Sequence, residues 1–384
     1  MKATITQDVA ASAAASGPEA VAQACTESVR GLGGDLGLLL AFTSGEMDHQ
    51  AAGAALEEAG AGAPTAGLTG RGLFSSDGPL DEGCVAMAFG PKVRASVGAS
   101  PEASSDLRSA GRLSAERALE GLDGDADLML LFIDSTKGDI ADTISGAYEA
   151  AGPGIPLAGG AAGGAEKRHF HGGEATSDSV VAVAIEAGGS LGVGNTQSCS
   201  TRGTPSIVTR SDGQRLEEID GRPAEEVYLE QLGFTGVAMD DDEFEALAES
   251  HPLAQPELHG DVRLRHVLER TGDGAIITGT NIPASAAIEF TSLEFDDLLE
   301  SGRQSVTDAS RATGADTPKA ALVFDCAGRR RALRDGLAQE VEAISAALGD
   351  PPAPLAGLYT HGEVARLQGA KGDRNHAVVT VAFG

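Results

Sequence analysis

Two short segments near the end of the chain hold the side chains best suited to chemistry. In the first, Cys326 follows an apolar run, and Arg329, Arg330 and Arg331 begin three residues after it. A helix start and nearby guanidinium groups would favour the thiolate form, so Cys326 is a candidate ligand contact or reactive thiol. A buried structural thiol fits the same pattern, because free cysteine packs as a small hydrophobe.

Arg329 is the candidate for contacting an anionic group of a ligand. Its planar guanidinium can grip a carboxylate with two parallel hydrogen bonds. The alternative is a structural salt bridge with Asp325 or Glu363. Arg330 and Arg331 are expected to be solvated.

The second segment is PLAGLYTHGEV, residues 354–364. Tyr359 and Thr360 could present hydroxyl groups to a ligand, and Glu363 could hold an ammonium group or orient Arg329. A packed turn aromatic and a surface carboxylate are the alternatives. His361 would matter if Cys326 were a nucleophile, since it could then serve as the base.

Three stretches of the chain repeat the elements that must position these residues. Each has an apolar strand ending in phenylalanine, an Ala-rich helix, a Pro-x-Ala-Gly motif, a loop and a closing Val/Ala-rich strand. The phenylalanines are Phe42, Phe132 and Phe324, and the motifs begin at Pro64, Pro156 and Pro354. Short apolar strands alternating with helices predict α/β units whose loops lie at equivalent ends.

The spacing of the motifs predicts two domains. The second separation is about twice the first, which leaves room for a degenerate fourth unit within residues 210–300. We therefore expect an α/β fold of repeated units forming two mixed β-sheet lobes with helices packed outside. The first domain would span residues 1–204, and the second, with the degenerate unit and the third one, residues 205–384.

The Gly-rich loop at residues 158–173 could cradle an oxyanion, but it lacks a P-loop or dinucleotide-binding spacing. A loop that closes over a ligand is the preferred interpretation. His169 and His171 have no further ligand nearby, and the four cysteines show no metal-binding spacing, so neither a metal nor another cofactor is expected.

Composition narrows the class of protein further. The 384 residues carry 57 Asp and Glu against 28 Lys and Arg, a net charge of −29. Such a chain repels nucleic acid and anionic membranes. Scattered carboxylates with few lysines indicate a cytosolic protein of a salt-loaded, halophile-like cell. The alternative is an acidic surface that binds a basic partner, and the densest cluster of acidic residues lies at residues 239–250. No signal peptide or membrane span is expected, and a cytoplasmic location follows.

The two segments together resemble the FIST family. Cys326 to Arg329 matches the family's Cys-x-x-Arg motif, and Gly357 to Glu363 matches its Gly-Phe-Tyr-Thr-x-Gly-Glu motif with Leu358 in place of phenylalanine. Residues 251–253 and the surroundings of Arg263 and residues 273–274 also resemble its C-terminal half. The run at residues 68–72 resembles its N-terminal half but lacks that family's Cys and Glu.

The resemblance implies an intracellular sensory protein that binds a small molecule such as an amino acid and passes the signal to a separate protein. Cys326, Arg329, Tyr359, Thr360 and Glu363 would be the ligand-binding residues. Two alternatives stay open: a Cys-dependent hydrolase or transferase that uses Cys326, and a structural or partner-binding protein without a ligand.

Overall fold

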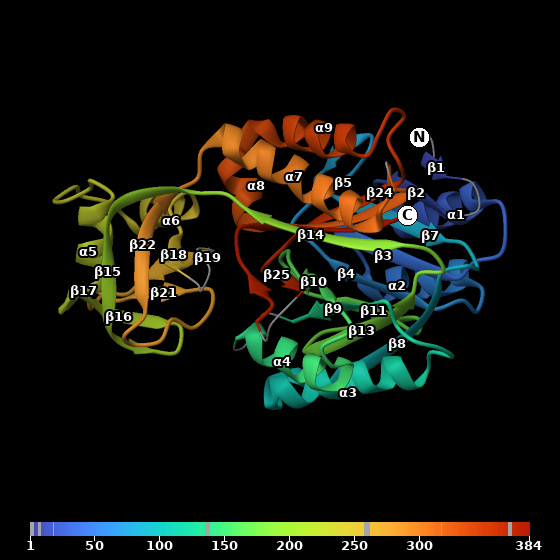
Figure 1. The fold of residues 1–384 in the computed structure, drawn as a ribbon, viewed down its shortest axis with the longest axis horizontal. Coiled ribbons are helices and arrows are strands. Elements are labelled where there is room, and N and C mark those ends of the chain that lie inside the picture. The colour runs from blue at the N-terminus through green and yellow to red at the C-terminus, as the bar shows by residue number, and fades with distance from the viewer. Residues whose placement is uncertain are drawn as a thin grey trace.

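The computed structural model describes residues 4–6, 9–17, 19–134, 139–256, 262–315, 317–367 and 371–384. It shows a large lobe of mixed sheets covered by helices and a smaller lobe beside it (Figure 1). The predicted α/β class with mixed sheets and outer helices is confirmed. The way in which the units are joined was not predicted.

The large lobe contains three units with one order of elements: strand, helix, strand, helix, strand, hairpin, strand. The first comprises β2 (Ala10–Ala15), α1 (Ala20–Leu32), β3 (Leu38–Ser44), α2 (His49–Gly60), β4 (Thr65–Thr69), β5 (Leu73–Ser75), β6 (Gly78–Leu80) and β7 (Gly83–Phe89), with β1 (Thr4–Thr6) at its edge. The second comprises β8 (Arg94–Pro101), α3 (Leu107–Glu120), β9 (Leu128–Ile133), α4 (Ile140–Ala151), β10 (Leu157–Ala161), β11 (His169–His171), β12 (Glu174–Thr176) and β13 (Ser179–Glu186). The third comprises β14 (Leu191–Gln197), α7 (Phe295–Thr313), β23 (Ala320–Cys326), α8 (Ala327–Leu333), α9 (Leu337–Ala347), β24 (Leu355–Thr360), β25 (Glu363–Arg366), β26 (Asp373–Arg374) and β27 (Ala377–Phe383).

Each unit gives its hairpin to a neighbouring unit. The sheet orders are β2-β7-β3-β4-β11-β12, β8-β13-β9-β10-β25-β26 and β14-β27-β23-β24-β5-β6. The hairpin of the first unit thus extends the sheet of the third, that of the second extends the first, and that of the third extends the second. This cyclic exchange makes the three units one body with approximate threefold symmetry.

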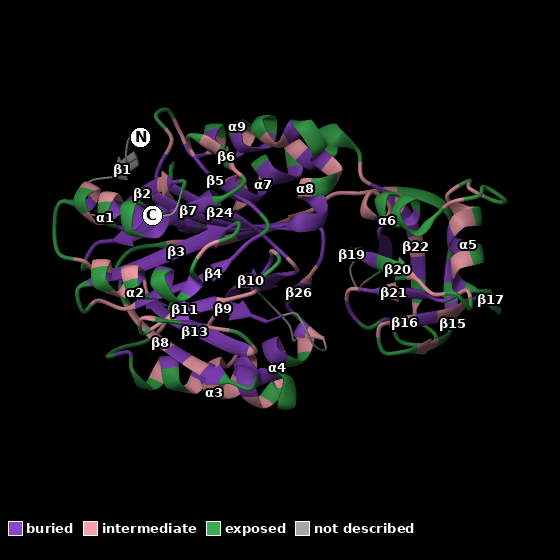
Figure 2. Cartoon of the chain, turned by 180° about the vertical axis from the view of Figure 1, so that it is seen from behind, coloured by how far each residue is buried: buried purple, intermediate pink, exposed green. Residues whose placement is uncertain are grey.

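The core follows from strands that are buried on both faces. In β3, Leu38, Leu40 and Phe42 point to the centre of the lobe, whereas Leu39 and Ala41 pack under the outer helices. Figure 2 shows the consequence, since the strands are buried and exposed residues lie on the outer sides of the helices.

The three repeated phenylalanines meet at the centre. The ring centroids of Phe42, Phe132 and Phe324 lie 6.1, 5.8 and 6.2 Å apart, pair by pair, in edge-to-face or tilted contact. These nearly equal distances mark the approximate threefold axis. The loops after β4, β10 and β24 lie at the same end of the sheets, because the strands they follow are equivalent.

The small lobe is inserted into the third unit between β14 and α7. It comprises β15 (Ser200–Asp212), β16 (Arg215–Ile219), β17 (Arg222–Pro223), α5 (Ala224–Gln231), α6 (Asp241–Glu249), β18 (Leu253–Pro256), β19 (Val262–Arg265), β20 (Val267–Arg270), β21 (Ile276–Thr278) and β22 (Ala287–Ser292). All strand pairs given for it are antiparallel. The degenerate fourth α/β unit expected at residues 210–300 is therefore wrong, because no described strand–helix–parallel strand crossover is built there.

The two lobes are held together by buried polar contacts. Asp373 on β26 accepts from Arg263 (3.1 Å) and Arg265 (2.7 Å) of β19, and all three side chains are at most 4% exposed. The backbone N–H of His266 donates to Asn375 Oδ1 at 3.2 Å. These contacts set the small lobe over the end of the large lobe where the three equivalent loops lie.

Candidate functional site

A cavity of about 390 Å³ lies between the lobes. Its walls come from all three units and from the small lobe: Arg71, Ile140, Lys167, Gln214, His266, Leu268, Gly279, Cys326, Ala327, Gly328, Arg331, Thr360, His361, Gly362 and Asn375. The volume is within the range of small-molecule sites in proteins. This is the part of the described structure where the repeated loops and the inserted lobe face one another.

A ring of backbone hydrogen bonds forms the floor of the cavity. Each Pro-x-Ala-Gly glycine is followed four residues later by an N–H that donates to the next unit. The donors and acceptors are Arg71 N to Tyr359 O (2.8 Å), Gly163 N to Thr69 O (2.8 Å) and His361 N to Ala161 O (3.0 Å). The three loops are thereby fixed in equivalent positions, and Arg71 and His361 line the cavity from two of them.

Three cationic side chains line the cavity, one from each unit: Arg71, Lys167 and Arg331. Arg331 pairs with Glu249 of the small lobe. Burial, followed by the charges of Arg331 and Arg330, lowers the pKa of Arg71. Burial also lowers the pKa of Lys167, against the charge of Asp134. Burial is the larger cause of both shifts, and for Arg71 alone the neighbouring guanidinium groups of Arg331 and Arg330 add to it.

Histidines add neutral polar groups to the same walls. His266 Nδ1 lies 2.8 Å from His376 Nε2, so one ring donates to the other across the lobe boundary. Burial lowers the pKa of His361 to about 4, with further lowering by Lys167, Arg71 and Arg331. Burial, and secondarily Arg331, lowers the pKa of His266 to about 4. These rings are therefore neutral at physiological pH.

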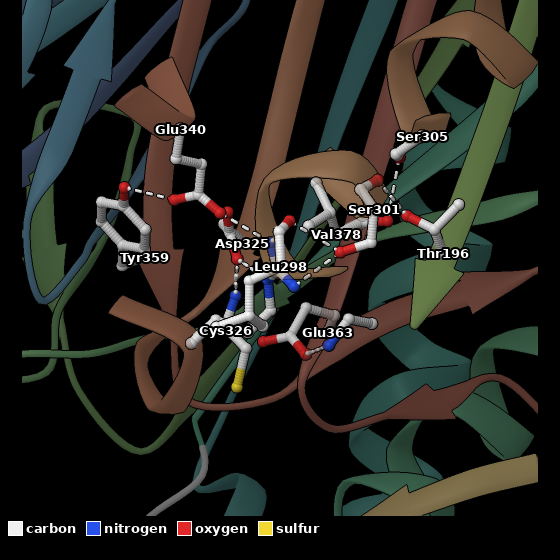
Figure 3. A network of polar contacts seen from close by, with 12 residues as sticks. Thr196, Leu298, Ser301, Ser305, Asp325, Cys326, Glu340, Tyr359, Glu363 and Val378 are labelled. Atoms are coloured by element: carbon white, nitrogen blue, oxygen red, sulfur yellow. Dashed lines mark hydrogen bonds and ion pairs between the residues drawn. The ribbon is translucent and has the colours of Figure 1, made fainter. Parts of the chain in front are cut away.

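Cys326 ends β23, directly before α8, and lines the cavity although it is only 5% exposed. Burial, followed by the nearby Glu363 carboxyl, raises the pKa of its thiol well above the ordinary value, while N–H groups of Gly328 and His376 oppose that shift. In Figure 3, Cys326 and Glu363 lie side by side. The thiol is thus protonated at neutral pH, contrary to the thiolate that the neighbouring arginines suggest.

Glu363 lies behind the cavity wall and is fully buried. The Thr360 hydroxyl, which has one proton, lies 3.0 Å from Glu363 Oε1 and 3.1 Å from Asp325 O. Burial raises the pKa of Glu363 well above the ordinary value. A protonated Glu363 can donate to Thr360 while Thr360 donates to Asp325, which satisfies both contacts. Glu363 therefore holds the loop in place, and Thr360 is the residue of the pair that lines the cavity.

Arg329 does not line the cavity but lies in a closed polar network, and Figure 3 labels its partners Asp325, Ser301, Leu298 and Glu340. Its Nε donates to Asp325 (2.8 Å), its Nη1 to Ser301 (2.8 Å), and its Nη2 to Glu340 (2.6 Å) and to the Leu298 carbonyl (3.0 Å). The side chain is 0% exposed. Since all three nitrogens are occupied, Arg329 forms the structural salt bridge that was the alternative to ligand binding.

Tyr359 belongs to the same network. Its hydroxyl donates to Glu340 Oε2 at 3.0 Å, and its ring packs 5.2 Å from that of Phe74. Burial and the charge of Asp325 raise the pKa of Glu340 to about 8. One guanidinium thus balances one carboxylate, and the second carboxyl carries a proton at neutral pH.

Of the five residues chosen from the sequence, Cys326 and Thr360 line the cavity, whereas Arg329, Tyr359 and Glu363 support it from behind. Arg331 was expected to be solvated but faces the cavity. Lys167 was part of the loop expected to close over a ligand. Arg71 and His266 were missed; the position of Arg71, equivalent to His361 in the repeat, was the signal that could have found it.

The fold and the cavity define a two-lobed protein built on three α/β units with an inserted antiparallel lobe. The chain belongs to the FIST family: the FIST N domain model matches residues 37–222 and the FIST C domain model matches residues 224–366. FIST domains are associated with the sensing of small ligands in signal transduction. The two matches meet inside the small lobe, and a division of the chain at residue 204 stays a prediction.

Two uncharacterized proteins of Mycobacterium tuberculosis, from strains CDC 1551 / Oshkosh and ATCC 25618 / H37Rv, are similar to this chain. Each is 28% identical over 229 residues, which is 56% of this chain. The chain spans 58% of the length of these curated relatives. Among the described residues, no helix is both long and apolar enough to cross a membrane.

Proposed function

We propose that this protein is a cytoplasmic sensor that binds a small molecule in the cavity between its lobes. The observation that supports the proposal is the origin of the walls, since one 390 Å³ cavity takes residues from all three units and from the inserted lobe. A molecule bound there contacts both lobes at once. Binding would therefore change the free energy of one lobe arrangement relative to others.

The proposed signal is a change in how the lobes meet. The lobes are joined by the contacts of Asp373 with Arg263 and Arg265, and by the His266–His376 hydrogen bond beside the cavity. A ligand that displaces His266 or Arg331 would alter this boundary, and a separate signalling protein would read the altered surface. The hypothesis of a partner-binding protein without a ligand gains no support from an open, polar cavity at the boundary.

The Cys-dependent hydrolase is the weaker candidate. Cys326 and His361 line one cavity, but no hydrogen bond between them is found among the described contacts. The raised pKa of the thiol also disfavours the nucleophilic form. We expect iodoacetamide to alkylate Cys326 more slowly than a small free thiol at neutral pH; faster alkylation would revive the hydrolase.

The absence of tryptophan from the chain allows a direct binding test. Leu268 lines the cavity and is 44% exposed, so Leu268→Trp places a single fluorophore in the wall without filling the core. Phe295→Trp, at the start of α7 and outside the cavity wall, is the matched control. The two variants would be screened with amino acids and other metabolites at low and at molar KCl, because the acidic composition predicts a salt-loaded cytosol.

A ligand of the cavity should change the fluorescence of the Leu268→Trp protein, leave that of the control unchanged, and raise the melting temperature of the unsubstituted protein. Amino acids, the ligand class that the family resemblance implies, are one of the sets of compounds in this screen. The proposal fails if no metabolite has these effects and if native mass spectrometry detects no small molecule bound to the purified protein.

A further inference from the structure

The charges around the cavity differ from those of the rest of the molecule. Asp and Glu outnumber Lys and Arg by two to one in the chain, yet the cavity wall contains Arg71, Lys167 and Arg331 and no Asp or Glu among its described residues. Arg330, next to Arg331, pairs with Asp81 on the outside. Arg71 and Lys167 make no ion pair with a described carboxylate. Two of the three cations at the cavity therefore have no ion-pair partner among the described residues.

The nearest carboxyl groups do not cancel these charges. Glu363 lies behind Cys326 and Thr360, and it is fully buried and hydrogen-bonded to Thr360. Glu249 pairs with one nitrogen of Arg331, Nη1. Asp134 offsets part of the charge of Lys167, whose pKa it raises, but it does not line the cavity, and its Oδ2 accepts the Asp178 N–H at 2.7 Å. Positive charge therefore prevails inside the cavity.

This arrangement discriminates between classes of small molecule. A zwitterionic amino acid brings an ammonium group, and the described wall has no carboxylate to receive it. Like charges held a few ångströms apart in a partly desolvated site repel strongly. An anion, in contrast, gains charge-assisted hydrogen bonds from guanidinium groups that can grip oxygen atoms in pairs.

The remaining wall complements an anion rather than a cation. Asn375 and Gln214 each use one amide proton within the chain and have a second one to donate, while Ile140 and Leu268 provide apolar surface. The Cys326 thiol is a weak donor at the floor. The three cations come from three different units, so a ligand reaching all of them must carry its negative charge at more than one position.

We infer that the cavity binds a small oxyanion with two or more negative charges, such as a di- or tricarboxylate or a phosphate-bearing metabolite. The inference rests on the proposed function and names the class of ligand for the same cavity. The unpaired Arg71 and Lys167, together with Arg331, would hold the negative groups. A zwitterion or a neutral metabolite would bind more weakly.

The test measures binding to the full chain by calorimetry and by the fluorescence of Leu268→Trp. The probes are citrate and pyrophosphate, compared with zwitterionic glutamine and neutral glycerol at one ionic strength. The double variant Arg71→Gln, Lys167→Gln removes both unpaired cations. Arg303→Gln is the control, because Arg303 lies on the exposed side of α7 and pairs with Glu300.

Citrate or pyrophosphate should bind to the unsubstituted and Arg303→Gln proteins, and the double variant should bind at least about tenfold more weakly. Preference for citrate would indicate a carboxylate ligand, and preference for pyrophosphate a phosphate ligand. Circular dichroism of the double variant would confirm that it is folded, since neither cation makes a described ion pair whose loss would destabilise the fold.

The possible failures can be told apart. Equal affinity of the double variant and the control for the anions would place the binding elsewhere and overturn the inference. Binding of glutamine or glycerol in preference to both anions would overturn the inference and leave the proposed function standing. If none of the probes binds, and no ligand appears in the wider metabolite screen, the proposed function and the inference fall together.

Discussion

Two groups of charged residues, one behind the cavity wall and one at the cavity, differ in how their charges are compensated. Behind the cavity wall, Arg329 lies between Asp325 and Glu340, with all of its nitrogens occupied and no exposure. At the cavity, Arg71 and Lys167 have no described ion-pair partner. The first group can only hold the fold together, whereas the second has donors available for a ligand.

The difference teaches how to separate structural from functional arginines. A buried guanidinium must be paired, because removing a charge from water costs several kcal/mol unless hydrogen bonds replace its hydration. Arg329 meets this condition through contacts to β23, α7 and α9. A cation left unpaired at a cavity wall is hydrated instead, so a ligand can take the place of that water at little cost.

The largest effect on stability should come from a substitution that breaks the paired group around Arg329. Arg329→Met leaves Asp325 and Glu340 buried without their cation, so we expect a loss of about 3–5 kcal/mol in the free energy of unfolding. Urea denaturation measures it, and Arg303→Met on the surface of α7 serves as the control, with a change within about 0.5 kcal/mol. Equal stabilities for the two variants would show that the Arg329 network is not structural.

A smaller effect is expected from Tyr359→Phe. The substitution removes the hydroxyl that donates to Glu340 at 3.0 Å, so stability should fall by about 1–2 kcal/mol. Because Tyr359 does not line the cavity, ligand affinity should be unchanged. A fall in affinity in calorimetry, with the fold intact, would return Tyr359 to the binding residues proposed from the sequence.

The proton on Glu340 gives a pH-dependent test of the same group. Its pKa is about 8 in the folded chain and about 4.5 in the unfolded chain, so the folded state binds this proton more tightly. The stability contributed by the group is present at low pH and is lost as pH rises through about 8. The free energy of unfolding of the unsubstituted protein, relative to that of Glu340→Gln, should therefore decrease as the pH rises from about 4.5 to about 8. A difference in unfolding free energy that does not change with pH would contradict this assignment of the proton.

The smallest effect on stability should come from a substitution among the cations at the cavity, Arg71 and Lys167. Arg71→Gln removes a cation that faces two others, so the free energy of unfolding should change by no more than about 0.5 kcal/mol. Relief of repulsion by Arg331 and Arg330 would make any change a small gain. A loss comparable to that of Arg329→Met would mean that Arg71 supports the fold and that the two groups do not differ as described.

Much of the large lobe could be predicted from its repeats. The phenylalanines at the strand ends and the Pro-x-Ala-Gly motifs do mark equivalent positions, and the three rings meet at one centre. The hairpin exchange could not be predicted, because a hairpin carries no local signal for the sheet edge that will accept it. The inserted lobe was mistaken for a degenerate repeat, since spacing alone says nothing about strand direction.

The candidate site was predicted in part for a similar reason. Cys326 and Thr360, both chosen from the sequence, line the cavity because β23 and β24 are parallel and their carboxyl ends meet, and their role in ligand binding stays a prediction. Arg329 was assigned to a ligand because a Cys-x-x-Arg motif does not reveal which way the side chain turns. Its partner Glu340 lies on α9, and only packing brings that helix over β23.

The sequence by itself determined the class of fold, the three units, the end of the units where polar loops gather, and the strongly negative charge. Each of these follows from periodicity, turn chemistry or composition, which are local or additive properties. Only the tertiary structure decided which cations share the cavity. Arg71, Lys167 and Arg331 are far apart in the chain, and they share one cavity because three equivalent loops close around an axis beneath an inserted lobe.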